Sequence, residues 1–210
     1  MPDTGAAPVP VQLKAEEIMT LEQTKLIELL TSDAPDFARA KACQRLAVIG
    51  TREAVPALAA LLADPKFSHY ARYGLEPIPD PSVDDALREA SGKLTGRLQI
   101  GVINSLGNRR DTKAVEALAR LMDGSDADVA AAAAAALGRI GDGSAAKELQ
   151  RVLDRTKTVA GACLECCEGL LTKGNKEQAL ALYEALLLRS DLPPAVRLAA
   201  TRGQQATRRP

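Results

Sequence analysis

The sequence predicts an all-α fold, an α-solenoid in which pairs of helices stack in a row. The main observation is an internal repeat in residues 96–153, where Leu106 and Asp111 recur as Leu137 and Asp142, each 31 residues later. Self-similarity at such a period is typical of repeat architectures. The composition agrees, because aromatic residues make up 2% of the chain and tryptophan is absent. Helices packed through small side chains tolerate this composition, whereas a β-sandwich does not favour it.

Each copy of the repeat predicts two helices joined by a tight turn. In the second copy, an apolar run with seven consecutive alanines (130–136) is followed by Gly138 and Gly141, which end a helix. Asp142 then occupies an N-cap position. The next helix has an amphipathic face at i, i+3, i+4 and i+7 spacing, made of Ala145, Ala146, Leu149, Val152 and Leu153. One pair cannot bury such a face alone, so neighbouring pairs must cover it.

The string ALGRIGD at 136–142, continued through Leu153, resembles the HEAT-repeat pattern. It is most similar to the short, alanine-rich bacterial repeats that are also called phycobilisome-lyase-like HEAT repeats. The resemblance implies a right-handed α-solenoid of about six HEAT-like antiparallel helix pairs. It also implies that the second helix of each pair lines a concave face.

Along the chain, residues 1–19 are rich in proline without periodicity and are predicted to be a flexible lead. A capping box from Thr20 to Gln23 opens the first helix. The solenoid is predicted over residues 20–203. One leucine per repeat marks its register, at steps of 29, 31, 31 and 31: Leu58, Leu87, Leu118, Leu149 and Leu180.

The C-terminal part of the predicted solenoid ends in an unpaired helix at 194–202, followed by a polar tail at 204–210. This helix either caps the stack, supports self-association, or belongs to a longer array of which this chain is an N-terminal fragment. A further ladder at 31-residue steps, Asp80, Asp111 and Asp142, is interpreted as helix caps in preference to ligand-binding carboxylates.

The charge balance argues against polyanionic partners. Lysine plus arginine and aspartate plus glutamate each number 27, so the formal net charge is zero. General nucleic-acid binders and anionic-membrane binders need a basic footprint, and no apolar run is long enough for membrane insertion. The chain as given has no signal peptide and is expected in the cytoplasm; removal of a signal before residue 1 would instead make it an exported or periplasmic protein.

Two clusters are candidate contact sites for a partner protein. His69, Tyr70, Arg72 and Tyr73 gather residue types that are frequent in interface hot spots, although packing between repeats explains the tyrosines as well. The turn pair Arg109 and Arg110 forms the second cluster, and a solvated loop is its alternative.

Two further rows are expected on the concave face. By repeat register, Asp85, Glu116 and Lys147 are equivalent, as are Glu89, Arg120 and Arg151. The signs are mixed, which favours a folded protein partner over a single charged ligand. Of these residues, Glu116, Arg120, Lys147 and Arg151 are the candidate contacts.

Three cysteines at i, i+3 and i+4, Cys163, Cys166 and Cys167, are the remaining chemical feature. Their mid-helix position and the lack of a fourth ligand favour packing over a metal or redox site. His69 is the only histidine, so neither a Ser/His/Asp site nor a histidine-based di-iron site is predicted. No cofactor is expected.

The sequence thus predicts a non-catalytic scaffold that binds another protein through its concave helix face and turns. The alternative, which the family resemblance implies, is a lyase-like or accessory enzyme subunit that binds a cofactor between repeats.

Overall fold

The computed structural model describes residues 14–209, and within them the chain is all-helical without a strand. The α-helices are α1 (Ala15–Thr20), α2 (Gln23–Thr31), α3 (Asp36–Ile49), α4 (Val55–Ala60), α5 (Ser68–Leu75), α6 (Pro81–Lys93), α7 (Gly96–Asn108), α8 (Val115–Met122), α9 (Ala127–Ile140), α10 (Gly143–Leu153), α11 (Ala160–Thr172), α12 (Lys176–Leu188) and α13 (Pro194–Arg208). Short 3₁₀ turns at Arg52–Ala54, Thr112–Ala114 and Lys157–Val159 lead into α4, α8 and α11.

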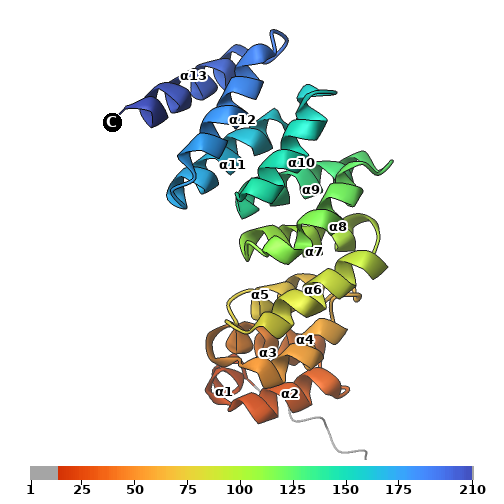
Figure 1. Ribbon diagram of the computed structural model, residues 1–210. Helices are drawn as coiled ribbons and strands as arrows, with labels where there is room; N and C mark the ends of the chain where they lie inside the picture. Colours follow the sequence, from red (N-terminus) through yellow and green to blue (C-terminus); the bar gives the residue numbers. More distant parts are fainter. Residues whose placement is uncertain (1–13, 210) are drawn as a thin grey trace, which may run out of the picture.

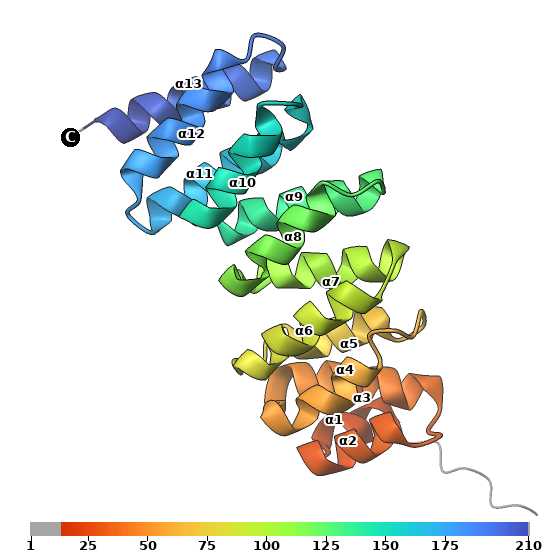
Figure 2. The same ribbon diagram turned by 45° about the vertical axis from the view of Figure 1, so that its right-hand side comes forward.

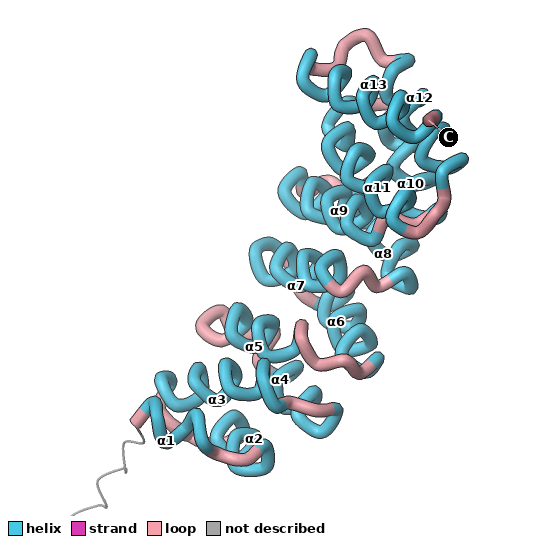
Figure 3. The backbone as a smooth tube through the Cα atoms, turned by 90° about the vertical axis from the view of Figure 1, so that its left-hand side faces the viewer, coloured by secondary structure: helices cyan, strands magenta, loops and turns pink. Residues whose placement is uncertain are grey.

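The helices stack into an elongated solenoid, which confirms the predicted fold class (Figure 1). Within the described residues, α1–α12 make six successive pairs, and α13 follows without a partner. The odd-numbered helices form one layer, here called the first-helix face, and the even-numbered helices form the other, the second-helix face (Figures 2 and 3). The apolar core runs between the two layers along the whole array.

The N-terminal boundary differs from the prediction. Residues 1–13 of the expected lead lie outside the described residues, but residues 15–20 form α1, and Ile18 is completely buried in the core. Thr20 ends α1 and does not cap α2, whose N-cap is Glu22 without a side-chain hydrogen bond. A single buried isoleucine anchors this helix, too short a periodicity to recognise in the sequence.

The aspartate ladder caps helices as predicted. The carboxylate of Asp80 accepts a hydrogen bond from the Ser82 backbone at 2.9 Å, and that of Asp142 accepts one from Ala145 at 2.8 Å. Asp111 accepts one from the Lys113 backbone at 3.1 Å. Each carboxylate satisfies an N–H that the helix leaves unpaired, which stabilises the start of the second helix by about 1 kcal/mol.

Close backbone approach holds α7, α9 and α11 together. A Cβ on Gly107 would lie 2.8 Å from the Cα of Ala136, and a Cβ on Gly138 would lie 2.8 Å from the carbonyl oxygen of Ala162. Gly169, a further 31 residues along, meets Gly141 at the same distance. These positions therefore need glycine because the neighbouring helix occupies the space that a side chain would fill.

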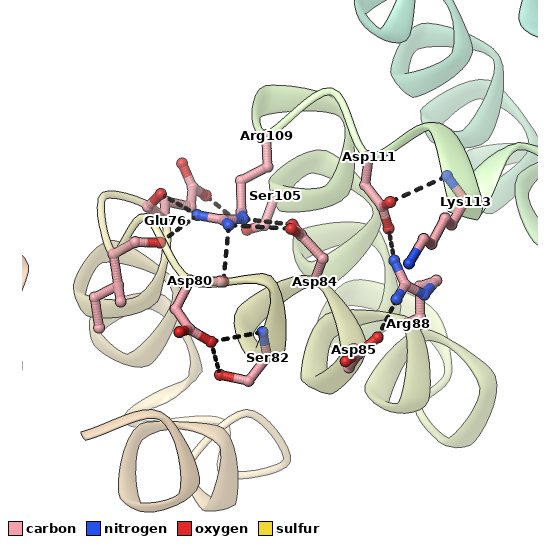
Figure 4. A network of polar contacts seen from close by, with 11 residues as sticks. Glu76, Asp80, Ser82, Asp84, Asp85, Arg88, Ser105, Arg109, Asp111 and Lys113 are labelled. Atoms are coloured by element: carbon pink, nitrogen blue, oxygen red, sulfur yellow. Dashed lines mark hydrogen bonds and ion pairs between the residues drawn. The ribbon is translucent and has the colours of Figure 1, made fainter. Parts of the chain in front are cut away.

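The junction between α5–α6 and α7–α8 is polar instead (Figure 4). Arg109, in the turn after α7, donates to both carboxylate oxygens of Asp84 at 2.5 and 3.1 Å. It also donates to the backbone carbonyls of Glu76, Ile78 and Asp80 at 2.7, 2.9 and 3.3 Å, which fixes the proline-rich turn after α5. Beside it, Arg88 bridges Asp85 and the buried Asp111.

At the C-terminal end, the register shifts by one residue relative to the prediction. Leu180 is only partly buried, whereas Ala179 is completely buried in α12. The helix α13 extends to Arg208, so most of the predicted polar tail is helical, and its Thr207 is buried. The outer side of α13 exposes Leu198 together with the polar Arg202 and Gln205. Among the described residues, no helix has the length and apolarity needed to span a membrane.

Candidate protein-interaction site

The second-helix face carries a groove between α8 and α10, here called the α8–α10 groove, with a volume of about 690 Å³. It collects all four residues predicted on the two register rows. Val115 and Ala119 lie at its base, and both are mostly buried. The charged side chains that line it are Glu116, Arg120, Asp123, Lys147, Glu148 and Arg151.

Ion pairs hold most of these charges in place. Arg151 of α10 donates to both oxygens of Asp123 at 3.1 and 2.7 Å, and its Nε donates to Glu148 at 2.8 Å. Arg120 pairs with Glu116 one helical turn away. Lys147 is exposed, and no described carboxylate lies within 4.0 Å of its ammonium group. It is therefore the one cation of this groove that is left for an external partner.

The bidentate pair also shifts the proton affinities of its members. The hydrogen bond from Arg151 holds the pKa of the Asp123 carboxyl below its usual value. Hydrogen bonds to Asp123 and then Glu148 raise the pKa of the Arg151 guanidinium. Both groups are charged throughout the physiological range, so the groove keeps a fixed pattern of alternating signs.

The cluster predicted around residue 70 lies on α5, on the first-helix face. His69 and Tyr73 are exposed, and the His69 and Tyr70 rings meet edge to face with centroids 5.7 Å apart. Arg72 points along α7, where its guanidinium covers Gly101. Burial lowers the pKa of Arg72. This cluster is therefore separate from the α8–α10 groove and faces the other side of the solenoid.

Arg109 and Arg110 differ sharply in their surroundings. The side chain of Arg109 is only 13% exposed, and the clamp described above uses all three of its guanidinium nitrogens. This geometry gives it a structural role in place of the predicted partner contact. Arg110 is exposed and has a positive φ of 54°, as Gly141 does one repeat later at 56°.

The three clustered cysteines are completely buried in α11 and carry free thiols. Burial raises the pKa of both Cys163 and Cys166 to about 12 and raises that of Cys167 as well. Protonated thiols away from solvent are poor nucleophiles and poor metal ligands. In the described part of the chain, no group of three or more His, Cys, Asp or Glu side chains is arranged to hold a metal ion.

Sequence reasoning missed two groups of surface residues. Asp123 and Glu148 complete the α8–α10 groove, and their position opposite Arg151 could have been found by placing neighbouring repeats side by side. Phe37 and Val48 are exposed on α3, beside the α5 cluster. Their signal is a large apolar residue on the polar side of an amphipathic helix.

Comparisons with known proteins identify the repeats. Residues 85–168 match the family described as HEAT repeats. Among solved structures, an engineered protein is similar with a TM-score of 0.50 and 21% identity, over 88% of this chain and 96% of that chain. The complex of CpcE and CpcF of phycocyanin lyase from Nostoc sp. PCC7120 gives a TM-score of 0.46 and 18% identity, over 99% of both chains. Human deoxyhypusine hydroxylase in complex with glycerol gives 0.39 and 16%, over 92% of this chain and 88% of that chain. No curated protein matches the sequence.

Proposed function

Because residues 85–168 consist of HEAT repeats within a longer helical solenoid, we propose that this protein is a non-catalytic scaffold that binds another protein through its second-helix face. The α8–α10 groove is the centre of the proposed contact. One observation carries the proposal: four residues from two repeats, chosen by register, line a single groove with fixed and alternating charges.

The charge pattern supports a folded protein as the partner. Three acids (Glu116, Asp123 and Glu148) balance three cations (Arg120, Lys147 and Arg151), so the groove has no net charge. A polyanion would have to displace the internal carboxylates, whereas a protein surface can match both signs. Electrostatic complementarity of this kind contributes specificity and association rate more than affinity.

The groove also indicates which groups the partner presents. Lys147 lacks an internal acid, so a partner Asp or Glu placed there forms a new ion pair without breaking an existing one. The base at Val115 and Ala119 is shallow and apolar, and it accommodates a small aliphatic side chain. The pair between Arg151 and Asp123 is already formed and needs no ordering on binding.

Site-specific photo-crosslinking tests the proposal. A benzophenone amino acid replaces Glu116 or Lys147 in the groove, and a matched control carries it at Ala131, which is exposed on α9. Cross-linked proteins from the native lysate are identified by mass spectrometry. We expect the same partner from both groove positions and none from the control.

A charge reversal then measures the contribution of the groove. Arg120→Glu with Lys147→Glu should weaken the identified partner by about tenfold or more, because two cations become repulsive. Lys176→Glu, at an exposed site on α12, is the matched control and should leave affinity unchanged. Equal cross-linking at Ala131, or unchanged affinity of the double variant, would contradict the proposal.

A further inference from the structure

The first-helix face exposes an apolar patch near its N-terminal end. Five large hydrophobic side chains are strongly exposed in the described chain, and three of them lie on α3 and α5. They are Phe37 at 53%, Val48 at 71% and Tyr73 at 55% exposed. The other two, Leu188 and Leu198, belong to the far end of the solenoid.

Packing between α3 and α5 places these three side chains over one area. The guanidinium of Arg39 lies over the Phe67 ring at 4.3 Å, and a Cβ on Gly74 would lie 3.0 Å from the carbonyl oxygen of Cys43. The two helices therefore run side by side in the same direction (Figure 3). Tyr73, next to Gly74, is level with the middle of α3, between Phe37 and Val48. Residues 37, 41 and 48 share one stripe of α3 because their spacing follows the helical period.

Cations without internal partners surround this patch. No described carboxylate lies within 4.0 Å of the charged groups of the four basic residues on α3, α5 and α7, namely Lys41, Arg45, Arg72 and Arg97. The basic residues of α6, α8 and α10 behave differently, since Arg88, Lys93, Arg120 and Arg151 all pair with acids.

The acids on this side are already engaged. Asp36 pairs with Lys66 at 2.7 Å. Glu76 follows Arg72 by one helical turn, but its carboxylate accepts hydrogen bonds from Ser105 at 2.6 Å and Asn108 at 3.1 Å. The patch is therefore positive although the whole chain has zero net charge. The buried Nε of Arg72 also lacks an acceptor, and a partly desolvated cation gains most when a carboxylate is brought close.

We propose that Phe37, Lys41, Val48, Tyr73 and Arg97, together the first-helix patch, bind an acidic amphipathic segment of a partner protein. The aliphatic and aromatic side chains of this segment cover Phe37, Val48 and Tyr73, and its carboxylates pair with Lys41 and Arg97. The patch lies on the opposite side of the solenoid from the α8–α10 groove, so it adds a second contact surface and does not depend on the first.

A protein segment fits the patch better than a nucleic acid does. Single-stranded nucleic acids bind through rows of aromatic side chains that stack on bases. Val48, the most exposed of the three apolar residues, offers no such ring, and Lys41 already lies 5.9 Å from the Phe37 ring centroid. An amphipathic helix, in contrast, alternates aliphatic anchors and carboxylates at the spacing of this surface.

Peptide display tests the proposal on the full chain. Random peptides of about 16 residues, long enough for four helical turns, are selected on the immobilised protein. They are counter-selected on the patch variant Lys41→Glu/Tyr73→Ser/Arg97→Glu. All three positions are exposed, and circular dichroism verifies that the variant folds. We expect enriched peptides with net negative charge and apolar residues at intervals of three or four.

Fluorescence anisotropy of a labelled representative peptide gives the quantitative result. The patch variant should weaken binding by about tenfold or more, and added salt should weaken binding to the native chain. The matched control Leu198→Ser/Arg202→Glu removes an exposed leucine and reverses an exposed cation at the other end, and it should bind as the native chain does.

Four results would overturn the proposal. The first is enrichment of neutral or basic peptides, and the second is equal binding of an acidic peptide to the native chain and the patch variant. The third is an oligothymidylate that binds more tightly than the peptides and is lost in the patch variant, which would assign the face to nucleic acid. The fourth is a dimer in sedimentation velocity that the same variant dissociates, which would make a second copy of the chain the occupant.

Discussion

Arg109 and Asp84 form a buried bidentate ion pair, with Nε 2.5 Å from Oδ1, that joins the turn after α7 to α6 of the preceding repeat. The next repeat has apolar residues at the equivalent positions, because Ile140 and Val115 lie 31 residues later and both are buried. One junction of the solenoid therefore uses an ion pair and carbonyl contacts where its neighbour uses hydrophobic side chains.

The first prediction concerns this pair. Arg109→Ile should lower the free energy of unfolding by about 2–4 kcal/mol, because it leaves Asp84 buried without a partner and removes donors from three carbonyls. Urea denaturation followed by circular dichroism measures the change. Asp84→Val should be similarly costly, whereas the double variant should cost less than the sum by about 1–3 kcal/mol.

The neighbouring arginine is the control for this cycle. Arg110→Ala removes an exposed side chain from the same turn and should change stability by no more than about 0.5 kcal/mol. Strictly additive effects of the Arg109 and Asp84 substitutions would show that the ion pair is not coupled.

The second prediction compares two helical glycines. Gly138→Ala should destabilise the chain by about 1–3 kcal/mol, because the added Cβ would lie 2.8 Å from the Ala162 carbonyl oxygen and force α9 away from α11. Gly161→Ala should stabilise it by up to about 1 kcal/mol, since a Cβ there meets no atom within 4 Å and alanine favours the helix. Thermal unfolding of the two variants should give shifts of opposite sign.

The third prediction concerns alkaline pH. Burial raises the pKa of Cys163 and Cys166 to about 12, so the folded state keeps these protons while the unfolded state releases them above about pH 9. The unfolded state then binds fewer protons, and stability falls as pH rises, by about 1 kcal/mol per thiol at about pH 10.

Urea denaturation at about pH 8 and about pH 10 checks this effect. The variant Cys163→Ala/Cys166→Ala should lose less stability between the two pH values than the native chain. Any cost of the substitutions themselves is present at both pH values and cancels in the difference. An identical loss in both proteins would show that the thiols do not contribute.

The fourth prediction concerns the docking of α13. The buried Tyr183 of α12 donates its hydroxyl to Glu168 at 3.0 Å, and its ring passes so close to Gly203 that an added Cβ would lie 2.4 Å from it. Gly203→Ala should therefore loosen α13, at a cost of about 1–3 kcal/mol. Hydrogen exchange should accelerate in α13 but not in α7 or α9. Gln205→Ala, at an exposed position of the same helix, should leave exchange unchanged.

The repeat period predicted the solenoid, the six pairs and the unpaired last helix, because each depends on patterns that recur at one step. The aspartate caps followed for the same reason. Helix α1 was missed because it is short and rests on Ile18 alone. The shift at Leu180 was missed because the last repeats match the pattern loosely, and a register error of one residue moves a side chain from the core to its edge.

The α8–α10 groove was predicted in part. Register placed Glu116 and Lys147 on one face, but it compared each residue with its counterpart 31 positions away. The ion pair between Arg151 and Asp123 joins residues 28 apart, which only the stacking geometry brings together. For Arg109, the same register contained an unused signal, since its counterpart Ile140 is a core residue.

The glycines at 107, 138 and 169 also bear on how this array can change in length. A 31-residue segment duplicated between Gly107 and Gly138 would place the same small contacts against both of its new neighbours. Recombination in the gene can therefore add or delete whole units in this half of the protein without new compensating substitutions. A crossover that separates Arg109 from Asp84 would leave a buried charge without its counterpart, so selection should keep α5 to α8 together as one inherited block.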